Sequence, residues 1–282
     1  RDNVWRHPER KAVFAGDFIC RGPDSRGVLE IVRNMVDNGA GYAVMGNHEL
    51  NITGFLTLDK SDKPIYQPSA STQKVIDGVI SLFADTPALL TNHVKWLRRL
   101  PLYLDFGAIR IAHAYWNPVD IALIDEKNTK GKLTKKNLKE IFRKKTPFTR
   151  AVQRTTRGVV LKMPKDLMVN DKKGTQRTRI RIKWWDEPLD KTFYELSYGN
   201  KFILPRYTVP KQLIPPFRVY DETEPLFFFG HYSVKPHKSM PRNNLCCVDN
   251  GVAITGLLTA YRWSGEKEVW EGNFVYGEKV DS

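Results

Sequence analysis

The sequence predicts an α/β protein, and three features support this prediction. Two short apolar runs, residues 11–16 and 42–46, have the composition of buried parallel strands. The chain between them has the pattern of an amphipathic helix, so the three elements form a βαβ unit. Two further apolar runs late in the chain, residues 226–230 and 245–248, also have the composition of strands.

The helix of this unit has clear start and stop signals. Asp24 or Ser25 can cap its N-terminus, and Gly39 can end it. The apolar positions at helical spacing are Val28, Ile31, Val32, Met35 and Val36. We therefore expect these five side chains to form one stripe that faces the protein interior.

Polar residues follow each strand of the unit. Asp17 comes directly after the first strand and its glycine, and Asn47 and His48 follow the second in the same way. The carboxyl ends of neighbouring parallel strands are where open α/β sheets bind ligands. The pattern therefore predicts a ligand site at this edge.

The chain up to residue 145 continues with helices and one hairpin. The predicted elements are a loop over residues 54–71, helices over 72–83 and 87–97, a hairpin of 102–106 with 109–112, a short helix over 118–124 and a basic helix over 134–145. Thr134 can cap the last of these helices.

The remaining chain is irregular before it returns to strands. Residues 146–216 are rich in Pro, Lys and Arg, and only residues 179–185 have a strand pattern there. The later predicted strands are residues 226–230, 245–248, 252–255, 258–262 and 269–276. Asn250-Gly251 is a typical hairpin turn.

The positive charge is concentrated in one segment. The 282 residues carry a net charge of +14, yet 20 Lys or Arg and only three acids lie between Lys127 and Lys183. We predict a core made of residues 1–126 and 217–282, with residues 127–216 as a basic insertion or cap beside the ligand site. Such a segment either attracts a polyanion, nucleic acid included, or is simply a solvated surface.

Cysteine usage and hydropathy exclude several protein classes. The three cysteines do not suggest a disulfide framework, because Cys246 and Cys247 are adjacent in the sequence. No apolar run approaches the length of a membrane span, and no secretory signal is visible. We therefore expect a cytoplasmic protein without a membrane partner.

Four motifs in order resemble those of the calcineurin-like metallophosphoesterases. They are G-D-x-x-C-R-G at residues 16–22, G-N-H-E at 46–49, an isolated histidine at His113 and G-H at 230–231. The resemblance extends to I-R-I-K-W-W at 180–185 and L-T-A-Y-R-W at 258–263. It is strongest to the bacterial serine/threonine-phosphatase-like and diadenosine-tetraphosphatase-like subgroup, and it implies a four-layer α/β/β/α sandwich.

The resemblance also implies a reaction and a metal centre. The chain would be a phosphatase that hydrolyses a phosphoester or a nucleoside polyphosphate with two divalent metal ions, Mn or else Fe or Zn. Asp17 would bridge the two ions, and Asn47, His113 and His231 would complete one site. Each of these residues also has an ordinary structural role open to it: Asp17 as a turn cap, Asn47 in a left-handed turn and the histidines as hydrogen-bonded core residues.

Two further residues receive catalytic roles from the resemblance. His48 would protonate the leaving oxygen as the general acid, and Arg21 would clamp the phosphate with its planar fork. In the family the position of Cys20 is an aspartate that supports the catalytic histidine, so Cys20 is expected beside His48 without the same hydrogen-bonding power.

One family motif has no counterpart in the sequence. The metallophosphoesterases begin with D-x-H, which supplies ligands for the second metal, and nothing upstream of Asp17 matches it. One site would then be incomplete. The alternative function is therefore that of a truncated or degenerate relative, which binds metal and a phosphorylated ligand or nucleic acid without efficient turnover.

Overall fold

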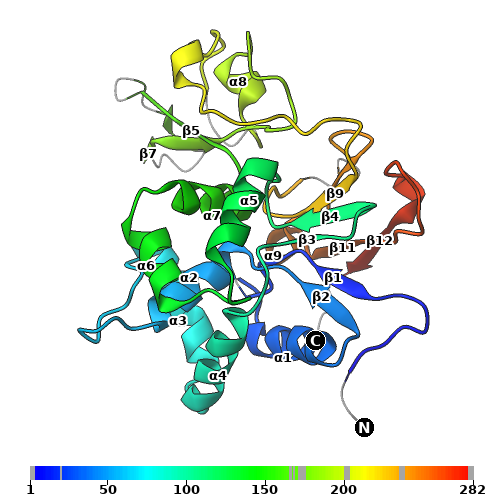
Figure 1. The fold of residues 1–282 in the computed structure, drawn as a ribbon. Coiled ribbons are helices and arrows are strands. Elements are labelled where there is room, and N and C mark those ends of the chain that lie inside the picture. Colours follow the sequence, from blue (N-terminus) through cyan, green and yellow to red (C-terminus); the bar gives the residue numbers. More distant parts are fainter. Residues whose placement is uncertain are drawn as a thin grey trace.

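The structure is a computed structural model with a mixed α/β fold, as the sequence predicts (Figure 1). The residues it describes are 4–19, 21–164, 167, 169–170, 176–199, 204–234 and 239–278. In that part of the chain, every helix is too short or too polar to cross a membrane.

The predicted βαβ unit is present at the start of the chain. Strands β1 (Ala12–Phe14) and β2 (Gly41–Ala43) are parallel neighbours, and helix α1 (Ser25–Asp37) connects them. Asp24 caps α1, because its carboxylate accepts a hydrogen bond of 2.8 Å from the backbone N–H of Gly27.

The predicted apolar stripe of α1 is partly wrong. Val28 and Ile31 are each 42% exposed, whereas Leu29 and Val32 are buried. The helix is rotated so that the row through Leu29 and Val32 faces inward, and the row one position earlier in each turn faces outward.

Helix α2 (Asn47–Leu56) follows β2 directly and was not predicted. Its last residues, 54–56, lie in the stretch 54–71 that was expected to be a loop. Helices α3 (Ala70–Ser81) and α4 (Pro87–Leu97) confirm the helices predicted over residues 72–83 and 87–97.

A second sheet has the strand order β10-β9-β4-β3. Strands β3 (Tyr103–Asp105) and β4 (Ile109–Ala112) form the predicted hairpin, while β9 (Leu226–Phe229) and β10 (Leu245–Cys247) add to it in parallel with β4. Strands β11 (Leu257–Tyr261) and β12 (Phe274–Glu278) form a separate antiparallel pair.

Residues 252–255 do not form the predicted strand. They form the one-turn helix α9 (Val252–Thr255), which lies between Gly251 and Gly256. Both glycines have left-handed backbone angles, which limit the segment to one helical turn, so the predicted hairpin turn at Asn250-Gly251 is wrong as well.

Two helices pack the start of the basic segment onto the N-terminal helices. They are α6 (Lys135–Arg143), which was predicted, and α7 (Pro147–Arg157), which was expected to be irregular. Leu138 of α6 and Val152 of α7 share one apolar cluster with residues of α1–α4. Helix α5 (Pro118–Lys127) packs against α7, and the domain boundary at residue 127 stays a prediction.

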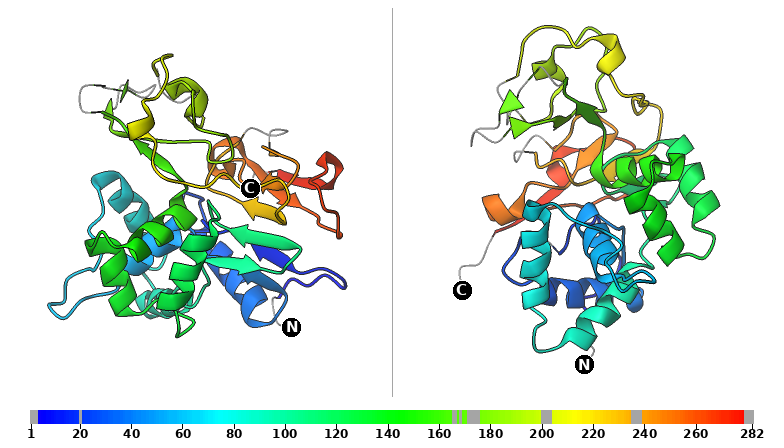
Figure 2. Two further views of the ribbon diagram at one scale, coloured as in Figure 1. Left: turned by 45° about the horizontal axis from the view of Figure 1, so that its top comes forward. Right: turned by 90° about the vertical axis from the view of Figure 1, so that its left-hand side faces the viewer.

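The rest of the basic segment lies at the opposite end of the molecule from α1–α4 (Figures 1 and 2). Its elements are β5 (Val160–Lys162), β6 (Val169–Asn170), β7 (Gln176–Arg177), β8 (Arg179–Arg181), α8 (Phe193–Leu196) and the 3-10 turn Lys211–Leu213. A second 3-10 turn, Glu271–Asn273, precedes β12.

Strand β9 separates two apolar clusters by its alternating side chains. Leu226 and Phe228 pack with Val44 near the end of β2, so the two sheets share a core. Phe227 and Phe229 face the other way, toward Trp184 and Trp185 of the basic segment. The two tryptophans are therefore packing residues.

Tyr232 anchors the basic segment to the loop after β9. Its buried hydroxyl accepts a hydrogen bond of 3.3 Å from the backbone N–H of Val159 and donates one of 3.3 Å to the carbonyl of Ile182. Gly158 passes against this ring with a φ of +71°, and a Cβ there would lie 2.1 Å from the hydroxyl oxygen.

Gly158→Ala is expected to lower the free energy of unfolding by about 2–4 kcal/mol, because alanine is strained at this φ and collides with Tyr232. Gly78→Ala is the matched control, since Gly78 lies inside α3 with open space around its Cβ position, and it should stabilise by about 0.5–1 kcal/mol. Urea unfolding of both variants measures the difference. Equal unfolding midpoints would contradict this account of the anchor.

Candidate metal centre

Four of the predicted site residues follow the carboxyl ends of strands that meet in the middle of the molecule. Asp17 follows β1, Asn47 is the first residue of α2 after β2, and His113 and His231 follow β4 and β9. The backbone holds these ends together, because the N–H of Gly230 donates a hydrogen bond of 2.9 Å to the carbonyl of His113. Asp17 and Asn47 thus lie at the carboxyl ends of the parallel pair β1–β2, and His113 and His231 lie at those of the parallel pair β4–β9.

Two glycines allow the loops after β1 and β2 to touch. A Cβ on Gly16 would lie 2.6 Å from the backbone nitrogen of Gly46 and 2.8 Å from Nδ1 of His113. A Cβ on Gly46 would lie 2.3 Å from Oδ1 of Asp17. The glycine in each motif is thus required by close packing at the site itself.

Asp17, His113 and His231 form a cluster that could hold a metal ion. One ligand atom from each lies within 4.8 Å of the others, and Nε2 of His113 is 3.1 Å from Oδ2 of Asp17. Asp17 and His231 have positive φ angles of 58° and 63°, which are uncommon for residues other than glycine. Such backbone strain is typical of functional sites.

The hydrogen bonds of His113 determine which of its nitrogens has a free lone pair. Nδ1 lies 2.7 Å from the carbonyl of Ala15, which can only accept, so Nδ1 carries the proton. In the neutral ring Nε2 then presents a lone pair to the carboxylate of Asp17. Two acceptors at this distance repel each other unless a proton or a cation lies between them.

A second buried acceptor in the described structure also lacks a donor. Oδ1 of Asn47 has no hydrogen-bond partner, and neither has Nε2 of His113. Buried polar atoms are normally paired, so two unpaired acceptors at one site indicate a missing electropositive partner. Amide oxygen, imidazole and carboxylate are together a donor set that suits Mn, Fe or Zn.

The electrostatics of the cluster favour an ionised carboxylate on Asp17 and a neutral imidazole on His231, whereas, against the effect of burial, the charge of Asp17 raises the pKa of His113. Burial alone would raise the pKa of Asp17, but the neighbouring His113, His48 and His231 hold it well below its usual range. Burial lowers the pKa of His231 strongly, and the charges of Arg181 and His113 lower it further. These are the protonation states in which both side chains bind metal.

Glu49 fastens the two loops together. Its buried carboxylate accepts hydrogen bonds from the backbone N–H groups of Gly46, Asp17 and Ile19 at 2.9, 2.8 and 3.2 Å. Burial and the charge of Asp17 raise the pKa of Glu49 to about 7. In the sequence, Glu49 is only the last residue of the G-N-H-E motif. The structure shows that its carboxylate holds the backbone of Asp17 in place.

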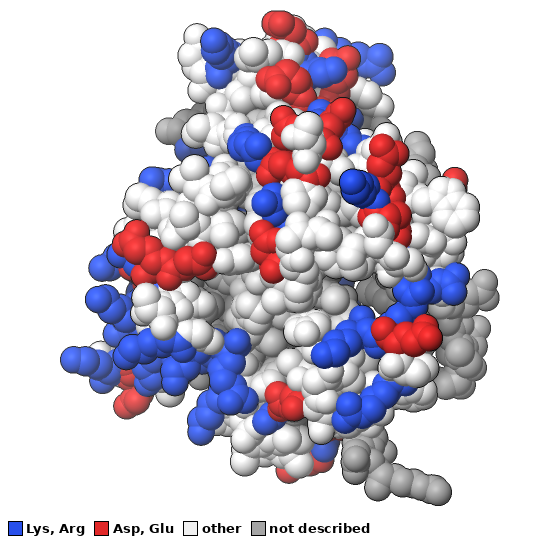
Figure 3. All heavy atoms as spheres, turned by 45° about the vertical axis from the view of Figure 1, so that its right-hand side comes forward, with Lys and Arg blue, Asp and Glu red and all other residues white. Residues whose placement is uncertain are grey.

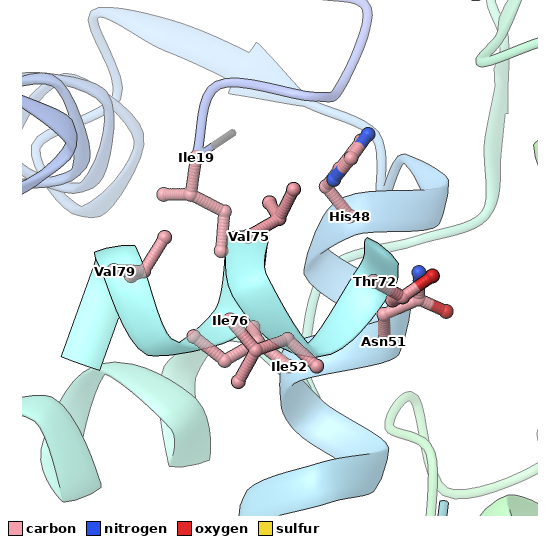
Figure 4. A pocket seen from close by; sticks show the side chains of 8 residues that line it. All are labelled: Ile19, His48, Asn51, Ile52, Thr72, Val75, Ile76 and Val79. Carbon is pink, nitrogen blue, oxygen red and sulfur yellow. The ribbon is translucent and has the colours of Figure 1, made fainter. Parts of the chain in front are cut away.

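His48 lies beside the cluster at the start of α2. Its Nε2 is 3.8 Å from Oδ2 of Asp17, and burial together with the charge of Arg21 lowers its pKa, although Asp17 opposes this. Figure 4 shows His48 at the edge of a small pocket between α2 and α3. The pocket is mainly apolar, lined by Ile19, His48, Asn51, Ile52, Thr72, Val75, Ile76 and Val79.

The two remaining predicted residues are Arg21 and Cys20. The side chain of Arg21 is exposed, with its charge acting on His48, and Cys20 lies outside the described residues. The expected position of Cys20 beside His48 therefore stays a prediction.

Two arginines of the basic segment also reach the site and were not predicted. Arg157, the last residue of α7, donates a hydrogen bond of 2.6 Å to Oδ1 of Asn51, and its charge interacts with Asp17. Arg181 of β8 donates to the carbonyl of His231. The I-R-I-K-W-W motif contained the signal for Arg181, whereas nothing around Arg157 distinguished it from its many basic neighbours.

Comparisons with known proteins show the family of this chain. The family model described as calcineurin-like phosphoesterase matches residues 4–253. A symmetrical bis(5'-nucleosyl)-tetraphosphatase from Wigglesworthia glossinidia brevipalpis is 28% identical over 90% of this chain and 85% of its own length.

Two further relatives match shorter parts of the chain. A symmetrical bis(5'-nucleosyl)-tetraphosphatase from Ralstonia nicotianae is 30% identical over 36% of this chain and 31% of its own length. An asymmetrical one from Geobacillus thermodenitrificans is 31% identical over 38% of this chain and 44% of its own length.

Glu49→Gln is expected to destabilise the protein by about 1–3 kcal/mol, because an amide nitrogen would replace one acceptor and leave a buried backbone N–H unpaired. Mn²⁺ binding should weaken as well, since Asp17 loses its support. Glu126→Gln is the matched control, because Glu126 is exposed on α5, and its effect should stay within about 0.5 kcal/mol. Chemical unfolding and calorimetric Mn²⁺ titration report the two effects, and a Glu49 variant that behaves like the control would rule out the fastening role.

Proposed function

Because this chain belongs to the calcineurin-like phosphoesterase family and is thus a hydrolase of phosphoesters, we propose that it cleaves nucleoside polyphosphates at a divalent-metal centre. The observation that supports this most strongly is the pair of facing acceptors on Asp17 and His113, 3.1 Å apart, with the unpaired amide oxygen of Asn47.

Asp17, Asn47, His113 and His231 would hold the metal. Divalent ions, with Mn as the first candidate, supply a hydroxide nucleophile at neutral pH and neutralise phosphoryl oxygens. The proposal includes a second ion on Asp17 as the bridging ligand, as the family resemblance implies. Glu49 and the touching glycines fix Asp17 for this task.

The surrounding polar residues would bind and protonate the substrate. His48 is proposed to donate a proton to the leaving oxygen, since it lies at the mouth of the cluster with an apolar wall behind it. Arg21 and Arg157 are proposed to bind the reacting phosphate, because guanidinium groups pair with phosphate in two-pronged fashion. Arg157 suits this role because it is partly desolvated and interacts with Asp17.

The relatives suggest the substrate class to test first. They are tetraphosphatases of both the symmetrical and the asymmetrical kind, so diadenosine tetraphosphate is the proposed first substrate. Product analysis distinguishes the two modes: symmetrical cleavage yields two ADP, and asymmetrical cleavage yields ATP and AMP. A chain that binds Mn²⁺ and substrate but releases neither set of products would be the degenerate relative considered above.

The basic face of α6 favours nucleic acid as a second candidate partner. Lys135, Lys136, Lys144 and Lys145 are exposed there, and no ion pair of the described residues involves them. Figure 3 shows basic side chains gathered along one edge of the molecule, which such a partner could contact. Binding to oligonucleotides that weakens steeply with salt would support this proposal, and binding that salt does not change would remove it.

Removal of a proposed ligand should weaken metal binding. His113→Ala is expected to weaken Mn²⁺ binding by at least about 10–100-fold, since even the loss of an outer hydrogen-bond partner has effects of that size. His7→Ala is the control, because His7 is exposed and remote in the sequence from every site motif. Calorimetric titration of chelator-treated protein measures both affinities. Unchanged affinity in the His113 variant would refute the ligand assignment.

His48→Ala should slow hydrolysis by about 10²–10⁴-fold when the leaving group needs a proton. The loss of rate should be smaller on p-nitrophenyl phosphate, whose leaving group departs readily without a proton. Steady-state rates with diadenosine tetraphosphate and the aryl ester, each in the presence of Mn²⁺, give the comparison. Equal losses on both substrates would assign His48 a role other than proton donation.

A further inference from the structure

Arg181 and Arg157 are brought together by paired strands of the basic segment. Arg181 pairs with Val160 across β5 and β8, and the N–H of the next residue, Ile182, donates a hydrogen bond of 3.1 Å to the carbonyl of Val159. Arg157 stands two residues before Val159 in the chain. The hydroxyl of Tyr232 contacts both strands, so one anchor holds both arginines beside the loop that carries His231.

The two arginines face different parts of the candidate metal centre. The charge of Arg157 interacts with Asp17. Arg181 instead donates through Nη1 to the backbone carbonyl of His231, and its guanidinium lies 5.9 Å from the ring centroid of Tyr232. Arg181 therefore lies at the loop after β9, which carries His231.

Apart from the interaction of Arg157 with Asp17, the charge of these two arginines has no counterpart among the described residues. Neither Arg157 nor Arg181 forms an ion pair with a carboxylate there, although both side chains are half-buried. Each guanidinium also repels the other. Two neighbouring cations that are partly removed from water are costly unless an anion joins them.

We propose that Arg181 binds the phosphate next to the reacting one, and so selects polyphosphate chains over phosphate monoesters. The proposal rests on the proposed function, since it takes the reacting phosphate to lie at Asp17. A guanidinium has five N–H donors, and the described contacts of Arg181 include one donated hydrogen bond. A monoester would reach Arg157 only, whereas a polyphosphate chain would span both arginines.

The shared ligand chemistry is a chain of bridged phosphates, from a nucleoside polyphosphate or an inorganic one. Arg181→Gln should lower kcat/KM for diadenosine tetraphosphate about 10–100-fold more than kcat/KM for p-nitrophenyl phosphate, the usual effect of losing a hydrogen bond to a charged group. Arg181→Lys should restore part of the loss. Arg179→Gln is the matched control, because Arg179 lies on the same strand and is exposed, and it should behave as the wild type.

A binding measurement keeps this test separate from the proposed function. Calorimetry without added metal should show tighter binding of inorganic tripolyphosphate than of phosphate to the wild type, and Arg181→Gln should remove most of that preference. A wild type that hydrolyses neither substrate would defeat the proposed function, while the tripolyphosphate preference would still decide the role of Arg181.

Two outcomes would overturn the role of Arg181. Equal losses on the monoester and the tetraphosphate would mean that Arg181 acts through His231, and an unchanged preference for tripolyphosphate would mean that it binds no second phosphate. Greater loss on diadenosine tetraphosphate than on tripolyphosphate would support the proposal and identify the nucleoside compound as the better-fitting source of the chain. The melting temperatures of all variants show whether each is folded.

Discussion

The site depends on one contact that is unfavourable unless something electropositive joins it. Nε2 of His113 and Oδ2 of Asp17 lie 3.1 Å apart, and the proton on Nδ1 is committed to the carbonyl of Ala15. Either a proton on Nε2, which the charge of Asp17 favours by raising the pKa of His113 against the effect of burial, or a cation must therefore lie between the two atoms. The surrounding backbone fixes both side chains, and a divalent cation would form a bond to each of the two atoms.

The rest of the structure serves to hold that contact in place. Gly16 and Gly46 allow the loops after β1 and β2 to touch, and the carboxylate of Glu49 then joins their N–H groups. From the other sheet, the loop after β9 brings in His231, and Tyr232 in the same loop anchors two strands of the basic segment. The proposed donor set thus comes from both sheets, and Arg157 and Arg181 come from the basic segment.

Sequence patterns predicted the elements whose signals are local. Helices α1 and α4 began where Asp24 and Pro87 predicted, and the β3–β4 hairpin turned at Gly107. Elements decided by tertiary context were missed. Residues 252–255 have a strand composition but form a helical turn between two left-handed glycines, and α7 is polar and basic yet buries Phe148 and Val152 against other helices. Likewise, motif order predicted the convergence of Asp17, His113 and His231, but not the contacts of Glu49, Arg157 or Arg181.

The central claim is that a divalent ion occupies the space between Asp17, His113 and His231. Anomalous diffraction from crystals soaked in Mn²⁺ tests it most directly, because the manganese signal locates the ion without reference to activity. The account predicts a peak within bonding distance of Oδ2 of Asp17 and Nε2 of His113, with the amide oxygen of Asn47 turned toward it. Manganese bound elsewhere, with no peak between these side chains, would contradict it.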